Sequence, residues 1–297
     1  MAKTPFLERL AVGAVLISDG ATGTNLQKRG LPIGAAAELW VLEAPDEIRA
    51  LNQAFIQAGA EILLTCTFGA SRHRLAASGL AEHFEAINRA ALAITLDAAA
   101  EHDVLVAGSI GPLGQMLAPF GEVTVEEAEA DFREQAAILC QEGADLIVVE
   151  TQYDINEASA AVRAVRSVDT EIPLVCSFSY DRGTRTMMGV SPERMAEEID
   201  VLDVDLLGIN CGRSLEDNLA ALTLLRAATE KPLWFKPNAG LPEVGMDGEA
   251  VYAVTPEEMA DLVPGWVAAG ARVIGGCCGT SPEHLRALAR AVHANRE

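Results

Sequence analysis

The stretch QEGADLIVVETQYD, residues 141–154, contains the pattern that decides the fold. A glycine follows a helical segment, an alanine leads into a continuous apolar run, and the acids Glu150 and Asp154 come at its end. The glycine and alanine recur together in QAGAEI (57–62) and AAGARV (268–273). Because glycine is the usual residue just past the end of a helix, the junction predicts a repeated step from helix to strand.

Eight apolar runs of strand length recur along the chain, and they are continuous rather than alternating in polarity. Such runs are typical of parallel strands that are covered on both faces. Eight strand–helix units in 297 residues favour an α/β fold, a single (β/α)8 TIM barrel forming one domain over residues 1–297, with an open α/β sheet as the alternative. The runs lie at 14–20, 61–69, 103–112, 145–154, 172–180, 204–212, 231–240 and 271–280.

Helix start signals lie between the apolar runs. Thr124 is followed three residues later by Glu127, which predicts a capping box for a helix over 124–142. Ser191, Thr255 and Ser281 are each followed by proline and then glutamate, an arrangement that favours the first turn of a helix.

The charge balance limits the classes of partner. The chain has 22 lysines and arginines against 43 aspartates and glutamates, a formal net charge of −21. Nucleic acids and anionic membrane surfaces would be repelled, so we expect neither as a partner. The first 20 residues do not have the layout of a signal peptide, and no apolar stretch is long enough to cross a membrane. We therefore expect a cytoplasmic protein whose thiols stay reduced.

Chemistry in a (β/α)8 barrel gathers at the carboxyl ends of the strands. Three of the six cysteines, Cys211, Cys277 and Cys278, lie at the ends of the sixth and eighth runs. Three thiolates meeting there would make a zinc site with an open fourth position, which is the catalytic kind. Alternatively each cysteine is a small buried apolar residue, or the adjacent pair forms a disulfide. The five histidines are expected on helix or loop surfaces, so a histidine general base is not expected.

Several motifs together resemble the homocysteine S-methyltransferase family of zinc-dependent (β/α)8 barrels, and most closely the homocysteine-binding module of cobalamin-dependent methionine synthase. These motifs are SDGATGTNLQ, GADLIVVETQYDINEASAAV, LLGINCG, KPNAGLP and GGCCGTSPEHL. The resemblance implies that Cys211, Cys277 and Cys278 hold Zn²⁺ and that homocysteine sulfur takes the fourth position. It also implies that Asp19 and Glu150 receive the substrate ammonium group, and that Thr65 and Asn210 line the same pocket.

The resemblance further implies methyl transfer to the homocysteine thiolate to give methionine. The expected donor is a methyl-corrinoid (cobalamin) on a separate protein or module, because the chain ends after the eighth helix and has no D-x-H-x-x-G corrinoid motif. S-methylmethionine, S-adenosylmethionine or betaine is the alternative donor. Cys66 departs from the family, which usually has Asn or Phe there, and is either inert packing or an alternative zinc ligand in the substrate-free state.

Two other classes of function fit some of the same residues. A zinc hydrolase in this barrel would usually have histidine or carboxylate ligands, and the shortage of histidines at the strand ends argues against it. A non-catalytic protein that binds zinc or homocysteine would keep every motif, and only an activity assay separates it from an enzyme.

Overall fold

The computed structural model describes residues 4–244 and 250–294. In this part of the chain eight parallel strands form one sheet in the order β1-β10-β7-β6-β5-β4-β3-β2. A parallel bridge between Ser18 and Ile62 joins the two edges of the sheet, so the strands form a nearly closed barrel. The strands are β1 (Leu16–Ile17), β2 (Ile62–Leu64), β3 (Leu105–Ile110), β4 (Leu146–Gln152), β5 (Leu174–Phe178), β6 (Leu206–Cys211), β7 (Leu233–Pro237) and β10 (Ala271–Ile274).

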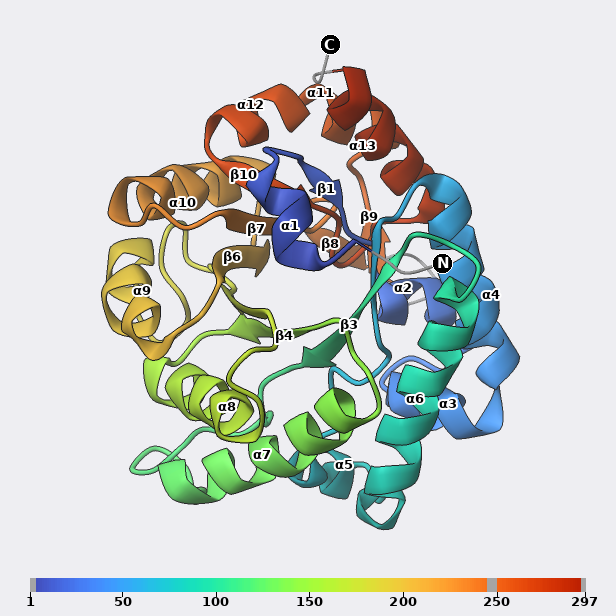
Figure 1. Ribbon diagram of the computed structural model, residues 1–297, viewed down its shortest axis with the longest axis vertical. Coiled ribbons are helices and arrows are strands. Elements are labelled where there is room, and N and C mark those ends of the chain that lie inside the picture. Colours follow the sequence, from blue (N-terminus) through green and yellow to red (C-terminus); the bar gives the residue numbers. More distant parts are fainter. Residues whose placement is uncertain (1–3, 245–249, 295–297) are drawn as a thin grey trace.

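Each of the eight apolar runs contains one of these strands, so the predicted (β/α)8 TIM barrel is confirmed and the open sheet is excluded. The helices form a ring around the strands (Figure 1). They are α1 (Phe6–Ala11), α2 (Thr22–Gln27), α3 (Trp40–Glu43), α4 (Pro45–Ala58), α5 (Arg72–Ala77), α6 (Phe84–Ala99), α7 (Val125–Gln141), α8 (Ile155–Val168), α9 (Pro192–Ile199), α10 (Leu215–Ala228), α11 (Pro256–Asp261), α12 (Val263–Ala268) and α13 (Pro282–Ala294).

The helix boundaries follow the local signals in the sequence. Thr124 and Glu127 form the predicted capping box of α7, and Thr255 forms a second capping box with Glu258 at the start of α11. Gly59, Gly143 and Gly270 all have positive φ, at 106°, 99° and 99°. The glycines of the repeated junction therefore adopt the left-handed conformation in which each chain segment turns from helix to strand.

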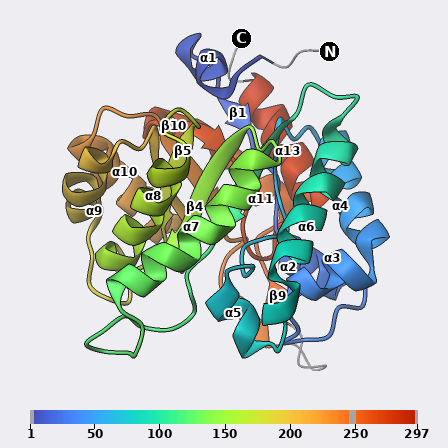
Figure 2. The same ribbon diagram turned by 60° about the horizontal axis from the view of Figure 1, so that its bottom comes forward.

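Inward-facing side chains fill the barrel, as expected for a packed core rather than a pore. Helix α1 lies across the end at which the strands begin (Figure 2), where Phe6 packs on the interior cluster. The buried members of that cluster are Phe6, Leu16, Ile62, Leu64, Leu105, Ala107, Leu146, Val148, Val175, Leu206, Trp234 and Val273. The packed interior and α1 leave the opposite, carboxyl-terminal end of the strands to form a site.

Two features differ from the sequence expectations. An antiparallel hairpin of β8 (Pro242–Val244) and β9 (Ala250–Tyr252) follows β7 and was not predicted. His284 was expected on the surface but is buried, with its Nε2 2.9 Å from the carbonyl oxygen of Val254 and its Nδ1 3.0 Å from Ser281 Oγ. None of the described helices is long and apolar enough to cross a membrane.

Candidate active site

The three cysteines predicted as metal ligands meet at the carboxyl-terminal end of the barrel. Cys211 ends β6, while Cys277 and Cys278 lie in the loop between β10 and α13. Their sulfur atoms all lie within 4.8 Å of one another, and the Sγ atoms of Cys211 and Cys277 are 2.9 Å apart. A Zn²⁺ ion binds thiolate sulfur at about 2.3 Å, so this donor set fits one such ion. Among the described residues, no other group of three or more Cys, His, Asp or Glu side chains brings its ligand atoms this close together.

The backbone around these thiols is held by a dense set of hydrogen bonds. Cys211 has a φ of 56°, a conformation that a non-glycine residue rarely adopts, and its carbonyl oxygen accepts from the side chain of Asn218 at 2.7 Å. The amide of Cys277 donates to Pro237 at the end of β7, at 2.9 Å. Strain of this kind persists only where the surroundings impose it, as at a functional site.

The glycines before the cysteine pair permit close approach of neighbouring chain segments. A Cβ atom on Gly275 would lie 2.7 Å from the carbonyl oxygen of Asp19, and one on Gly276 would lie 2.3 Å from Thr280 Oγ1. Thr280 in turn donates to the carbonyl oxygen of Cys277 at 2.7 Å. Because positions 275 and 276 carry no side chains, the loop can pack closely against Asp19 and Thr280, and this packing positions the thiols of Cys277 and Cys278.

The three thiols are hydrogen-bonded to one another. Hydrogen bonds to Cys277 and Cys278, together with burial, raise the pKa of Cys211. Hydrogen bonds from Cys211 and Cys277, with a further one from Tyr252 of β9, lower the pKa of Cys278. The thiols of the cluster therefore lie close enough to shift one another's pKa.

A cavity of about 600 Å³ opens beside the thiols. Its wall includes all three cysteines together with Thr65, Ser109 and Glu150 from neighbouring strands. Lys236 of β7 and Tyr252 of β9 also line it, as do Glu38, Phe68 and Arg74. The cavity therefore combines the three thiols with acidic and basic side chains.

Glu150 ends the apolar part of β4 and presents a carboxyl group to this cavity. Its Oε1 accepts a hydrogen bond from Ser109 at 2.6 Å. Burial raises its pKa to about 7, with the Lys236 ammonium acting in the opposite direction and Cys277 adding to the rise. A cation placed against it would stabilise the charged carboxylate.

The structure places Thr65 on the cavity wall but places Asp19 and Asn210 behind it. Neither Asp19 nor Asn210 lines the cavity, and they are 1% and 0% exposed. The side-chain oxygen of Asn210 accepts from the Thr151 amide at 2.8 Å, and its nitrogen lies 3.5 Å from Cys211 Sγ. Asn210 therefore links the ends of β4 and β6 beside the Cys211 thiol.

Cys66 lines the cavity but is not a member of the three-thiol cluster. Burial and the nearby Glu38 carboxylate raise the pKa of its thiol well above the usual value. Its place outside that cluster favours inert packing over a role as a zinc ligand.

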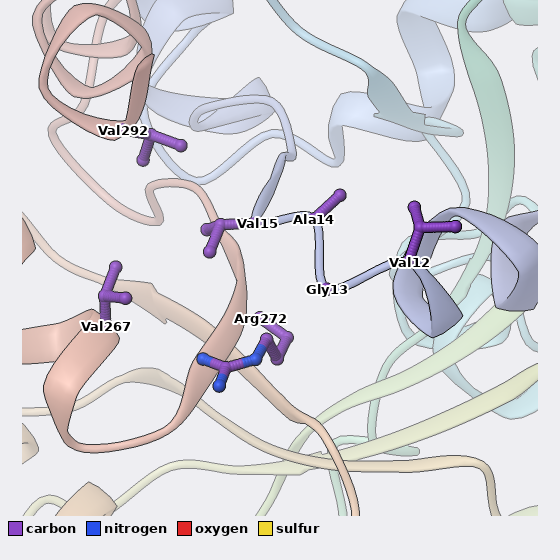
Figure 3. A pocket seen from close by; sticks show the side chains of 7 residues that line it. All are labelled: Val12, Gly13, Ala14, Val15, Val267, Arg272 and Val292. Carbon is purple, nitrogen blue, oxygen red and sulfur yellow. The ribbon is translucent and has the colours of Figure 1, made fainter. Parts of the chain in front are cut away.

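A second pocket, of about 480 Å³, lies at the amino-terminal end of the barrel (Figure 3). Valine side chains and the Arg272 guanidinium line it, with no thiol or carboxylate among the lining residues. The chemistry-bearing side chains thus gather at the other end.

Sequence reasoning missed Lys236 and Tyr252 in the cavity wall. Lys236 interrupts the apolar run of β7, and a lysine within a buried strand was a usable signal for a site. Tyr252 belongs to the hairpin that the sequence did not predict, so no signal pointed to it.

These features define the class of the protein: a (β/α)8 barrel with a cysteine-rich site at its carboxyl-terminal mouth. The model of the family described as homocysteine S-methyltransferase matches residues 16–292. The chain therefore belongs to the homocysteine S-methyltransferase family, as the sequence motifs predicted, and that family is one of methyltransferases.

Two curated relatives and one solved structure show the range of the family. The chain is 30% identical to methionine synthase of Mycobacterium leprae over 97% of its own length and 25% of that protein. It is 30% identical to betaine–homocysteine S-methyltransferase 1 of Danio rerio, over 99% of this chain and 77% of the relative. The metallated form of the Escherichia coli homocysteine methyltransferase MmuM superposes with a TM-score of 0.82 at 29% identity, over 97% of this chain and 99% of that one. The chain thus spans about a quarter of the methionine synthase.

Proposed function

We propose that this chain is a zinc-dependent homocysteine S-methyltransferase that transfers a methyl group to homocysteine sulfur and yields methionine. The observation that carries the proposal is the meeting of Cys211, Cys277 and Cys278 on the wall of a cavity that also presents Glu150 and Lys236. The family match over residues 16–292 and the likeness to a metallated homocysteine methyltransferase support it. We further propose that residues 1–297 act as a single domain.

The chemical difficulty of the reaction is that an alkyl thiol is mostly protonated near neutral pH, whereas the thiolate is the nucleophile. Bound Zn²⁺ would supply Lewis-acid stabilisation of the substrate thiolate. The protein holds three thiols for that ion and leaves the adjoining cavity for the substrate. Because three thiolates over-neutralise a divalent ion, a fourth sulfur there would stay electron-rich.

The remaining work of the protein is to position the substrate. Glu150 accepts the substrate ammonium group, which would lower the pKa of its carboxyl group from about 7. Thr65 contributes to the same wall, where its hydroxyl lies 2.6 Å from that of Thr67 and accepts from the Ser109 amide at 3.1 Å. Asp19 and Asn210 act from behind the wall, through Lys236 and through Cys211 respectively.

For the methyl donor, we favour a methyl-corrinoid carried by a separate protein or module. The 30% identity to methionine synthase over 97% of this chain supports that choice. A small methylated ammonium or sulfonium compound is the second candidate. It is supported by the likeness to betaine–homocysteine S-methyltransferase 1 and by the match to MmuM, which this chain covers over 99% of that protein's length.

The test combines metal analysis with an assay for methionine. Zinc-loaded protein is incubated with homocysteine and, separately, with methylcobalamin, a methylated corrinoid protein, betaine, S-methylmethionine or S-adenosylmethionine. We expect about one zinc per chain and methionine with one of these donors, and Cys211→Ser should lose both.

The matched control is Cys140→Ser, since Cys140 lies in α7 away from the cluster and should leave zinc content unchanged. Zinc content unaffected by Cys211→Ser would contradict the metal site. Tight binding of zinc and homocysteine without methionine from any donor would instead indicate a non-catalytic binding protein.

A further inference from the structure

Lys236 is a buried cation to which the proposed function assigns no contact with the substrate. It lies near the end of β7, is 3% exposed, and lines the same cavity as Glu150 and the three thiols. It is one of only four lysines in the sequence. Since lysine is almost never fully buried without a partner, its position calls for a specific role.

The partner of Lys236 is Asp19, which stands behind it. Lys236 Nζ donates to Asp19 Oδ1 at 2.5 Å, and Asp19 Oδ2 accepts from the Leu64 amide at 2.8 Å. Ser18 Oγ also donates a hydrogen bond to Asp19 Oδ1, at 3.4 Å. Asp19 is therefore held by the protein on both oxygens, and Lys236 is the member of the pair that lines the cavity.

Lys236 remains an ammonium in this environment. Burial lowers its pKa, but the carboxylates of Asp19 and Glu150 more than offset that effect, so the pKa is raised. An ammonium group has three N–H donors. Among the described residues, Asp19 accepts one of them, which leaves donor capacity beside the cavity.

The lining of the cavity has two acidic side chains, Glu38 and Glu150, and two basic ones, Arg74 and Lys236. Of these four, Glu150 and Lys236 have the nearby thiol of Cys277 among the groups that shift their pKa. An amino acid is a zwitterion, with an ammonium and a carboxylate on the same carbon. Glu150 and Lys236 together match both charges, whereas two acids alone would repel the carboxylate.

We propose that Lys236 binds the carboxylate of the amino-acid thiol while Glu150 binds its ammonium group. This inference rests on the proposed function, because it takes homocysteine as the substrate. It makes Lys236 a specificity-determining residue that selects an amino-acid thiol over an amine thiol of the same length.

The test compares two thiols that differ only in the carboxylate, homocysteine and 3-aminopropane-1-thiol. Their dissociation constants are measured by calorimetry with zinc-loaded protein, and independently from the absorption of Co²⁺-substituted protein, in which thiolate binding to the metal is visible. The wild-type protein should bind homocysteine about 10- to 100-fold more tightly, the range of a charged hydrogen bond.

In Lys236→Met this preference should disappear, through loss of homocysteine affinity with little change for the amine thiol. Lys236→Arg should retain part of the preference. Because Lys236→Met leaves Asp19 buried without its partner, the double variant Lys236→Met with Asp19→Asn is measured in parallel and should show the same loss. Lys231→Met is the matched control, since Lys231 pairs with Asp200 at 2.9 Å outside the cavity.

Equal weakening of both thiols in the Lys236 variants would overturn the inference and would assign Lys236 to holding Asp19 alone. An unchanged preference would overturn it too. In both cases methionine formation by the wild-type protein would leave the proposed function intact. Failure of the wild-type protein to bind either thiol would instead remove the proposed function, and this inference with it.

Discussion

At the scale of single residues, Glu157 is a buried carboxyl group that does not line the cavity beside the three thiols. It lies in the first turn of α8, is 1% exposed, and accepts a hydrogen bond from the Leu113 amide at 2.6 Å. Burial raises its pKa from 4.5 to about 7, and the Leu113 hydrogen bond offsets only part of that rise. The native state therefore binds a proton at Glu157 that the unfolded chain releases.

Because the pKa of Glu157 is higher in the native state, its contribution to stability declines as the pH rises from about 4.5 to about 7. At pH 8 a buried carboxylate opposes folding by up to about 3 kcal/mol, at 1.36 kcal/mol for each pKa unit. We expect Glu157→Gln to raise the free energy of unfolding at pH 8 and to change it little at pH 5, as measured by urea denaturation.

The exposed Glu101→Gln serves as control and should show no such pH dependence. A Glu157→Gln variant that is equally stabilised or destabilised at pH 5 and pH 8 would contradict the raised pKa.

The three thiols were predictable from the sequence because each lies at the end of an apolar strand run, where the barrel places its site. Lys236 and Asp19 were not predicted to pair, because 217 positions separate them in the chain. They come together because β1, β10 and β7 are consecutive strands in the sheet. Residue type and local sequence pattern thus indicate the three cysteines. The pairing of Asp19 with Lys236 can be recognised only once the order of the strands in the sheet is known.

At the scale of elements, the loop between β10 and α13 determines where two of the thiols stand. Gly276 precedes Cys277, and a Cβ atom there would lie 2.3 Å from Thr280 Oγ1 and 2.4 Å from its Cγ2. Thr280 is itself buried and fixed by hydrogen bonds to Cys277 and Ala21. The loop therefore has little room to adjust.

We expect Gly276→Ala to displace the cysteine pair, lowering zinc affinity at least about 10-fold and the free energy of unfolding by about 1–3 kcal/mol. Zinc affinity is measured by competition with a chromophoric chelator, and unfolding by urea denaturation of the metal-free protein.

Gly265→Ala is the control, because Gly265 lies in α12 with open space at its Cβ position. There alanine should be neutral or stabilise by up to about 1 kcal/mol. If Gly276→Ala bound zinc as tightly as Gly265→Ala, the loop geometry would not set the site.

The hairpin of β8 and β9 was the element that sequence reasoning missed. The eight barrel strands can be recognised in the sequence as continuous apolar runs, because helices cover one face and the barrel core covers the other. The described hairpin strands have three residues each, and Glu243 and Val251 on them are exposed. Strands of only three residues leave no period in the sequence that distinguishes them from a loop.

At the scale of the whole molecule, the net charge of −21 acts against compaction. Surface ion pairs such as Arg72–Glu134 and Arg133–Glu129, with nitrogen–oxygen distances of 2.7 Å each, oppose that repulsion. Each exposed pair is worth about 0–1 kcal/mol, and the 22 basic residues pair with at most about half of the 43 acids. Repulsion among the remaining acids therefore dominates at low ionic strength.

We expect the midpoint of thermal unfolding at pH 8 to rise when sodium chloride increases from 10 mM to 150 mM. Screening shortens the Debye length from about 30 Å to about 8 Å, and each kcal/mol gained corresponds to about 2–4 °C. Metal-free protein is used, so that salt effects on zinc binding do not contribute. A midpoint that falls with added salt would show that the ion pairs outweigh the repulsion.

The pairing of β1 with β10 has a consequence for how the protein is made. A ribosome releases the segment with Asp19 early, but the strand that must lie beside it, and the thiols that follow that strand, emerge some 250 residues later. A nascent chain cut short before residue 277 offers only one of the three sulfurs. Formation of the proposed metal site would thereby require translation past residue 278 and closure of the barrel, and a product that ends earlier would lack it.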